Sequence, residues 1–332
     1  MEILYVYRGR ERAAEIRDAI GKKHKVTSVH GPLHKVIKKI NTQNTQILIT
    51  FVDSIINKKV LAQMPKLKFI ATQSTGTDHI DLKTCQKKKI KVSNVPGYGS
   101  SSVGELAMLL LLSVARNLKE SFFQTHDGNF ERSEERGFEL KDRTIGIIGT
   151  GAIGAYVGQL AKGLGMKVIL YDLHPDKNLA RKLKAKYAKN IEELLPAVDV
   201  LSLHLPLLPS TRHMISYEEF ALMKRGSVLI NTARGGVIYS PALLEHIEKG
   251  HLRGAGLDVL EFEQYLYSNH QTKGPMRRAI TRANRKLMHH PKVAHTLHLG
   301  AQTEEAGDRI LETTITNLKA FISKKPINLD SE

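Results

Sequence analysis

The chain has 332 residues, enough for two domains that each bury a core, and its 41% hydrophobic content excludes a disordered protein. A single cysteine, Cys85, excludes an internal disulfide framework and is compatible with a reducing cytosol, so we expect a cytoplasmic protein. The net charge of +17 raises the question of nucleic acid, but the cations fall in separate runs without interleaved aromatic residues. We therefore expect small anionic ligands, and not nucleic acid, as partners.

From the sequence we expect neither a signal peptide nor a membrane-spanning segment. Residues 1–8 look like a first strand and lack the basic, apolar and small-residue regions of a signal peptide. The longest apolar run, Leu106 to Ala115, has about half the length needed to cross a bilayer. We expect no membrane span.

Short apolar strands alternate with helical segments over residues 1–95. This alternation predicts a parallel sheet with helices on both faces, and such sheets bind ligands beyond the carboxyl ends of their strands. One strand-end loop, residues 72–78, contains Gly76, which can present backbone N–H groups to an anion. An ordinary turn is the alternative. The predicted strands are Ile3–Tyr7, Val26–Val29, Ile47–Thr50, Phe69–Ala71 and Lys91–Ser93.

A break rich in turn residues, Pro96 to Ser100, predicts a linker to a second domain. Ser102 and Glu105 then have the spacing of a capping box, which predicts the start of a buried helix over Leu106 to Leu118. Residues 119–142 are polar, and we expect them to be irregular.

A second alternation of strands and helices begins at Ile145, and an amphipathic helix over residues 302–324 follows its last strand. We expect that helix to cross back to the first domain. The predicted fold is therefore α/β, with two doubly wound parallel-sheet domains and a ligand cleft between them. The domains are a discontinuous flavodoxin-like substrate domain, 1–99 and 299–332, and a Rossmann domain, 100–298.

Three spaced glycines between a predicted strand and a predicted helix fit the dinucleotide-binding pattern. Gly149, Gly151 and Gly154 would permit the turn, a close backbone approach to pyrophosphate and tight packing. Asp172 ends the next strand, where a carboxylate binds ribose hydroxyls and repels a ribose phosphate. The motif predicts NAD in preference to NADP, although His174 and Lys177 lie close behind.

Three further strand-end loops supply groups for hydride-transfer chemistry. Arg234 can hold a carboxylate with its planar fork, and the acids around Glu263 can pair with His295 or His298 as an acid–base couple. A lone arginine in a turn is more often a surface residue. Metal binding by these histidines with His289 and His290 is the competing interpretation, but their spacing fits no standard zinc pattern, and we expect no metal.

Six ordered segments resemble the D-isomer-specific 2-hydroxyacid dehydrogenases over nearly the whole chain. The segment from Glu263 to His298 holds a basic helical insertion, which resembles the D-lactate dehydrogenase-like branch. The six segments are Ala71 to Asp81, Gly149 to Gly154, Leu203 to Pro206 with Thr211 to His213, Asn231 to Gly236, Leu257 to Glu263, and His298 to Glu304.

The resemblance implies roles for individual residues and NAD-dependent reduction of a small 2-oxo acid to the D-2-hydroxy acid. Arg234 would bind the substrate, and Glu263 would orient His298, the proton donor and acceptor. Thr75, Gly76 and Tyr98 would complete the substrate site. Residues implied at the cofactor are Gly149, Gly151, Ala152, Ile153, Gly154, Asp172, Leu205, Pro206, Thr211, Thr232, Ala233 and Asp258, the last accepting from the carboxamide. A homodimer is the expected assembly.

Departures from the family pattern leave the substrate open. Leu297 replaces the proline usually found before the catalytic histidine, and Leu299 follows it where the lactate-like branch tends to carry aromatic residues. A glyoxylate or hydroxypyruvate reductase and a 3-phosphoglycerate-type dehydrogenase are alternatives. A catalytically silent NAD-sensing interaction protein is the alternative from another class. Formate-type members carry a glutamine at the position of Glu263, which counts against formate as the substrate.

Overall fold

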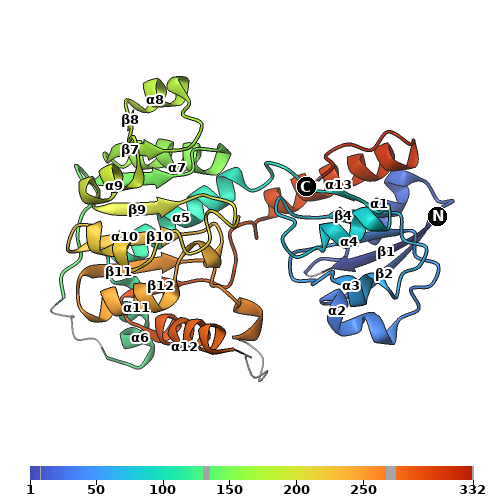
Figure 1. Ribbon diagram of the computed structural model, residues 1–332, viewed down its shortest axis with the longest axis horizontal. Helices are drawn as coiled ribbons and strands as arrows, with labels where there is room; N and C mark the ends of the chain where they lie inside the picture. Colours follow the sequence, from blue (N-terminus) through green and yellow to red (C-terminus); the bar gives the residue numbers. More distant parts are fainter. Residues whose placement is uncertain (8, 130–134, 267–273, 331–332) are drawn as a thin grey trace. The chain divides into compact units, whose positions relative to one another are not determined.

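The chain, in a computed structural model that describes residues 1–7, 9–129, 135–266 and 274–330, divides into two compact units (Figure 1). Unit 1 consists of Met1–Tyr98 and Thr303–Glu332, and unit 2 consists of Gly99–Gln302. Unit 1 is discontinuous because the C-terminal segment returns to it.

Unit 1 contains a five-stranded parallel sheet in the order β2-β1-β3-β4-β5, which is the flavodoxin-like order. Its strands are β1 (Glu2–Tyr7), β2 (Lys25–His30), β3 (Ile47–Thr50), β4 (Phe69–Thr72) and β5 (Lys91–Ser93). Its helices are α1 (Ala13–Ile20), α2 (Leu33–Val36), η1 (Ile37–Lys39), α3 (Lys58–Leu61), α4 (Leu82–Lys87) and α13 (Glu304–Ile322).

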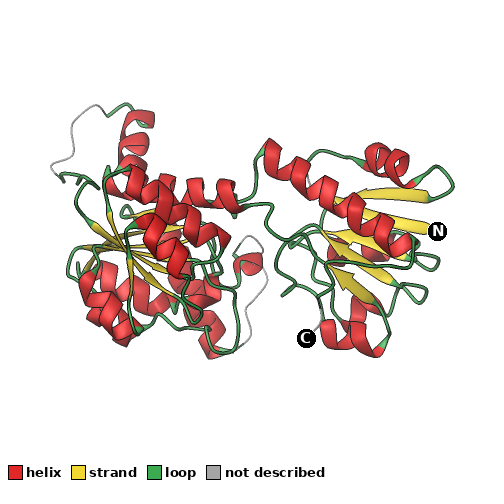
Figure 2. Cartoon of the chain, turned by 90° about the horizontal axis from the view of Figure 1, so that it is seen from above, coloured by secondary structure: helices red, strands yellow, loops and turns green. Residues whose placement is uncertain are grey.

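Helices cover both faces of this sheet (Figure 2). Every residue of β3 and β4 is therefore buried, as expected for central strands of a parallel sheet. The C-terminal helix α13 packs on one face beside α1, where the rings of Phe321 and Phe69 stack with centroids 4.3 Å apart. This packing ties the last helix of the chain to its first domain.

Unit 2 contains a seven-stranded parallel sheet in the order β12-β11-β10-β9-β6-β7-β8. The chain runs outward from β6 to β8 and then returns to β9 on the other side of β6, as in a Rossmann fold. The strands are β6 (Thr144–Ile148), β7 (Lys167–Tyr171), β8 (Lys186–Tyr187), β9 (Val200–Leu203), β10 (Ser227–Asn231), β11 (Leu252–Leu257) and β12 (Val293–His295). The predicted fold class is thus confirmed.

The helices of unit 2 lie on both faces of its sheet. They are α5 (Ser100–Ala115), α6 (Leu118–His126), α7 (Ala152–Gly163), α8 (Lys177–Leu183), α9 (Ile191–Leu194), η2 (Leu195–Ala197), α10 (Tyr217–Leu222), η3 (Gly235–Val237), α11 (Ser240–Glu248), η4 (Glu263–Tyr265) and α12 (Pro275–His289).

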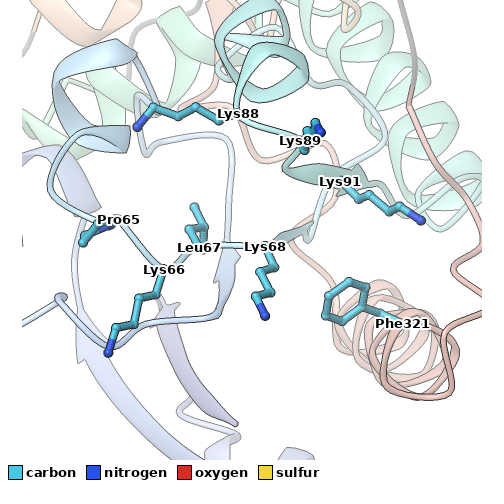
Figure 3. A pocket seen from close by; sticks show the side chains of 8 residues that line it. All are labelled: Pro65, Lys66, Leu67, Lys68, Lys88, Lys89, Lys91 and Phe321. Carbon is cyan, nitrogen blue, oxygen red and sulfur yellow. The ribbon is translucent and has the colours of Figure 1, made fainter.

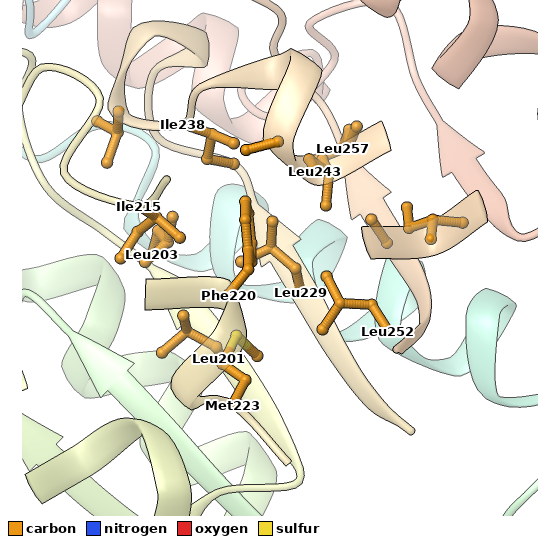
Figure 4. Packing of buried hydrophobic residues seen from close by; sticks show 14 of the residues in the cluster. Leu201, Leu203, Ile215, Phe220, Met223, Leu229, Ile238, Leu243, Leu252 and Leu257 are labelled. Carbon is orange, nitrogen blue, oxygen red and sulfur yellow. The ribbon is translucent and has the colours of Figure 1, made fainter. Parts of the chain in front are cut away.

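Strand β10 contributes side chains to two hydrophobic clusters, one on each face of the sheet of unit 2. Val228 and Ile230 belong to the cluster that includes α5 and α7, whereas Leu229 belongs to the opposite cluster. Successive side chains point to opposite faces, so a strand covered on both sides carries apolar residues at consecutive positions. Figure 4 shows Leu229 beside Phe220, one of the largest fully buried side chains.

The predicted capping box at Ser102 and Glu105 is wrong. Helix α5 begins earlier, at Ser100, with Gly99 as its N-cap, so that Ser102 lies inside the helix and donates to the Gly99 carbonyl at 3.3 Å. The motif failed because the preceding serines also continue the helix. A true capping box, formed by Ser216 with the residue three positions later, starts α10.

The segment predicted to be irregular begins with a helix, because α6 occupies Leu118–His126. Part of that segment, residues 130–134, lies outside the described residues. Among the described residues no single helix is long and apolar enough to span a membrane, and the pair α5 with α6 meets that test only across a bend of 69°.

Candidate functional site

The register of the sheet in unit 2 places the carboxyl ends of five strands level with one another. Ile148 pairs with Leu203, Leu203 with Asn231, Asn231 with Leu257, and Leu257 with His295. The loops that follow these residues therefore start from one edge of the sheet, where α/β proteins bind ligands.

The glycine turn lies at the point where the strand order reverses, between β6 and β9. Gly149 has a φ of +89°, and a Cβ on it would lie 2.4 Å from the carbonyl oxygen of His204. A Cβ on Gly154 would lie 2.0 Å from the Gly149 carbonyl oxygen. Packing alone therefore requires both glycines. A Cβ on Gly151 would meet nothing within 4 Å, so open space adjoins this residue.

The start of α7 fits an anion such as pyrophosphate. Gly151 is its N-cap and supplies no side-chain cap, and no acidic residue lies in the first turn. The first N–H groups of the helix, including those of Ala152 and Ile153, have no intrahelical acceptor. With the open space at Gly151, these groups form a cradle that a phosphate can enter.

Asp172 follows β7, and hydrogen-bond donors stabilise its negative charge. Its carboxylate accepts bonds from the Thr150 N–H at 2.6 Å, the Thr150 hydroxyl at 3.0 Å and the His174 N–H at 2.9 Å. Burial by itself would raise the pKa of Asp172, but these donors outweigh it and lower that pKa. A charged carboxylate at this place disfavours a ribose phosphate.

The loop after β9 carries the predicted cofactor residues Leu205, Pro206 and Thr211. The Thr211 hydroxyl donates to the Pro206 carbonyl at 2.7 Å and accepts from the Leu208 N–H at 2.8 Å. These bonds close the loop on itself. Leu205 packs against the core of unit 2 beside Gly149.

The turn after β10 carries Thr232, Ala233 and Arg234. The Asn231 side chain accepts from the Ala233 N–H and donates to the Arg234 carbonyl, both at 3.0 Å, which fixes the turn. The half-buried Arg234 guanidinium donates to the Ala233 carbonyl at 2.8 Å. Within the described residues the buried Thr232 hydroxyl has no hydrogen-bond partner, so it is available to bind a ligand.

Glu263 and His298 form a carboxylate–imidazole pair. Glu263 Oε1 lies 2.7 Å from His298 Nδ1, and about a third of each side chain is exposed, at 35% and 36%. Burial by itself would lower the pKa of His298, and the charge of Arg234 acts in the same direction. The hydrogen bond and charge of Glu263 outweigh both and raise that pKa.

Asp258 holds the loop that presents His298. Its buried carboxylate accepts from the Thr296 hydroxyl at 2.6 Å, the Leu299 N–H at 2.7 Å and the Gly300 N–H at 2.9 Å. The Asp258 carbonyl accepts from the His298 N–H at 3.0 Å. The sequence assigned Asp258 to the cofactor and did not reveal this positioning role, because its donors are mainly backbone groups.

The sequence also missed Glu261, which is 5% exposed and joins two loops. Its carboxylate contacts Arg212 and lies 2.7 Å from His213 Nε2. A Cβ on Gly235, the neighbour of Arg234, would lie 2.1 Å from the Glu261 nitrogen. Three loops therefore meet at Glu261. The segment Thr211 to His213 was the available sequence signal for this contact, but it did not indicate which acidic residue is the partner.

The other predicted substrate residues belong to unit 1. The Thr75 carbonyl accepts from the Asn94 side chain at 2.8 Å, and the Gly76 carbonyl accepts from the Ser74 hydroxyl at 2.8 Å. The Tyr98 carbonyl accepts from Arg309 in the returning helix α13 at 2.8 Å. The structure therefore groups Arg234, Glu263 and His298 in unit 2 and the other three in unit 1.

A separate hollow of about 440 Å³ lies in unit 1 near the starts of β4 and β5 (Figure 3). Thr75 and Gly76 follow the opposite end of β4, so this hollow is distinct from the predicted site. Its lining residues are Pro65, Lys66, Leu67, Lys68, Lys88, Lys89, Lys91 and Phe321. Across the described ranges no group of three or more His, Cys, Asp or Glu side chains is placed to hold a metal ion.

Residues 108–300 match the family model for the NAD-binding domain of D-isomer-specific 2-hydroxyacid dehydrogenases. This match covers the glycine turn, Asp172, Arg234, Glu263 and His298.

Relatives and solved structures agree with the family model. A glyoxylate reductase of Thermococcus litoralis is 36% identical over 281 residues, 82% of this chain and 80% of the relative. A hydroxypyruvate reductase of Thermotoga maritima is 36% identical over 286 residues, 86% of this chain and 87% of the relative. A D-lactate dehydrogenase from Aquifex aeolicus, solved with NAD and lactic acid, is 32% identical with a TM-score of 0.86, covering 99% of this chain and 100% of that one.

The glycine turn makes a prediction about stability. Gly154→Ala places a methyl group against a backbone carbonyl and should lower the free energy of unfolding by about 3 kcal/mol, with loss of NADH binding. Gly163→Ala, in the same helix but with nothing near its added Cβ, is the control and should be neutral or stabilising by up to about 1 kcal/mol. Chemical denaturation and NADH fluorescence measure both effects. Equal stability of the two variants would contradict the packing argument.

Proposed function

Because the chain belongs to the family of D-isomer-specific 2-hydroxyacid dehydrogenases, we propose that it reduces a small 2-oxo acid to the D-2-hydroxy acid with NADH, and catalyses the reverse oxidation with NAD. The family assignment makes it an NAD-dependent oxidoreductase that acts on a CH–OH group. The observation that carries the proposal is the 2.7 Å contact between Glu263 and His298, in the unit that also holds the glycine turn.

Each member of the site has a proposed task. Bound NADH supplies the hydride. Arg234 binds the substrate carboxylate through two of its N–H groups and polarises the neighbouring carbonyl. His298 gives its Nε2 proton to the oxygen that becomes the hydroxyl. Glu263 accepts from Nδ1, so it fixes the ring orientation and stabilises the imidazolium. Thr75, Gly76 and Tyr98 are the proposed substrate-binding residues of unit 1.

The raised pKa of His298 sets the pH dependence of the two directions. Reduction needs the protonated imidazole, so its rate should fall as the pH rises through this pKa. Oxidation needs the neutral imidazole, so its rate should rise over the same range. The contact with Glu263 keeps the protonated form present up to a higher pH than in an ordinary histidine.

Pyruvate and D-lactate are the first candidates for the substrate pair, since the similarity to the D-lactate dehydrogenase structure covers 99% of this chain. Glyoxylate and hydroxypyruvate are the second, because the relatives that are 36% identical carry those names. A steady-state panel should include these three 2-oxo acids, a branched 2-oxo acid and phosphohydroxypyruvate, each with NADH and NADPH. We expect turnover with at least one acid and a preference for NADH. Silence across the panel while NADH binds would favour an NAD sensor.

His298→Gln should lower the turnover number for reduction about 100-fold to 10,000-fold, because the proton donor is lost. NADH affinity should stay within about twofold, since the cofactor residues are untouched. His295→Gln is the control on the same strand end, because burial lowers the pKa of His295 and makes it a poor proton donor at neutral pH. Near-normal turnover in His298→Gln with inactivity in His295→Gln would reverse the choice of histidine.

We also propose that the chain forms a homodimer. Large apolar side chains are exposed on the neighbouring helices α5 and α6, where Leu109 is 54%, Phe122 67% and Phe123 60% exposed. Light scattering during gel filtration should give twice the mass of the chain. The double substitution Phe122→Ser and Phe123→Ser should shift that mass toward the monomer, and a monomeric unsubstituted protein would refute the proposal.

A further inference from the structure

Helix α12 lies in the basic insertion between Glu263 and His298, and the proposed reaction gives it no task. Two of its residues reach the turn that carries Glu263. Asn284, in the middle of the helix, contacts the backbone of Glu261, and Arg277, near its start, contacts the side chains on either side of Glu263.

The Asn284 contact is a buried hydrogen bond. The side chain of Asn284 is fully buried at 0% exposure, and its amide nitrogen donates to the Glu261 carbonyl oxygen at 2.7 Å. A buried polar side chain that holds a loop carbonyl fixes the loop strongly, because breaking the bond leaves two buried polar groups unsatisfied. The bond lies two residues before Glu263.

Arg277 makes the second contact. Its guanidinium lies over the ring of Phe262, 4.8 Å from the centroid, and 5.3 Å from the centroid of the Tyr265 ring. The two rings meet edge to face with centroids 6.4 Å apart. One cation therefore holds together the residue immediately before Glu263 and the residue two positions after it.

The turn needs such support because its backbone is unfavourable. Phe262 has a φ of 61°, in the left-handed region that a bulky residue rarely adopts. A conformation of this kind persists only where the surroundings hold it. The hydrogen bond that the turn itself gives to the Glu263 side chain is long, since its Oε2 accepts from the Leu260 N–H at 3.4 Å.

We propose that α12 is a positioning element for the acid–base pair: Asn284 and Arg277 hold the turn over residues 261–265 so that the Glu263 carboxylate stays on His298 Nδ1. Neither residue touches the reacting atoms. The catalytic consequence rests on the proposed function, but the geometric claim does not. Among the residues that the structure describes, the charged groups that act on His298 are Glu263 from η4, Asp258 after β11 and Arg234 before η3.

The test is the titration of His298, followed by histidine NMR in the full-length protein. The His298 signal is assigned as the one missing from His298→Gln, and Glu263→Gln gives the midpoint of the unpaired imidazole. We expect Asn284→Ala and Arg277→Met each to lower the His298 midpoint by at least half of the fall that Glu263→Gln produces. Thermal unfolding checks that the variants are folded, and Arg277→Met, on a half-exposed residue, keeps the test valid if Asn284→Ala is unstable.

Arg282→Met is the matched control because Arg282 is an exposed residue of the same helix. Removing a positive charge by itself favours protonation of a nearby histidine, so a lower midpoint in Arg277→Met cannot come from the lost charge. Arg282→Met should leave the midpoint unchanged or slightly higher. Midpoints equal to the unsubstituted protein in both folded test variants would overturn the inference.

The kinetic readout separates this inference from the proposed function. If the enzyme reduces a 2-oxo acid, the fall of kcat with rising pH should occur at lower pH in Arg277→Met, in step with the NMR midpoint, while KM for NADH stays unchanged. If no 2-oxo acid is reduced by the unsubstituted protein, the proposed function fails, but the NMR midpoints still decide whether α12 positions Glu263.

Discussion

The level carboxyl ends of the strands in unit 2 are the constraint on which the site depends. Parallel strands in register bring residues that are far apart in sequence to one edge, and each loop then needs to extend only a few residues. The glycine turn, Arg234 and His298 follow three different strands of this row. The proposed hydride transfer needs a cofactor site, a cation and a proton donor at one place. The register of the sheet brings the loops for all three to one edge.

Two buried carboxylates then fix the loops with the accuracy that the strands alone cannot give. Asp258 gathers the loop of His298 through one hydroxyl and two backbone N–H groups, and Glu261 joins the loop of Arg212 to the turn of Glu263. Burying a carboxylate without partners would cost several kcal/mol, on the order of the whole stability of a domain, so these donors are structurally required. The charge-assisted hydrogen bonds to these carboxylates offset the cost of burial and hold the loops in place.

The fold could be predicted because its signals are local. Apolar strands at a regular pitch and glycines with spacing fixed by the turn are properties of short segments, and the structure confirms the two parallel sheets. The roles of Glu261 and Asp258 depend on donors from other loops, so the sequence around each residue does not indicate its role. The Ser102 error has the opposite origin, since a local pattern matched a capping box although the helix had already begun at Ser100. The roles of Arg234, Glu263 and His298 remain predictions, supported by their common unit.

Two of the strained backbone positions lie at the carboxylate–imidazole pair of Glu263 and His298. His298 and Phe262 both have left-handed φ values, 55° and 61°, and such a conformation costs about 1–2 kcal/mol per residue. At His298 the Asp258 carbonyl and carboxylate hold the strained loop, and at Phe262 helix α12 does so. Phe262 immediately precedes Glu263, and His298 carries the imidazole itself, so both strained positions lie in the loops that bring the carboxylate and the imidazole together. The contacts that hold these two backbones therefore belong to the proposed acid–base site, together with the pair itself.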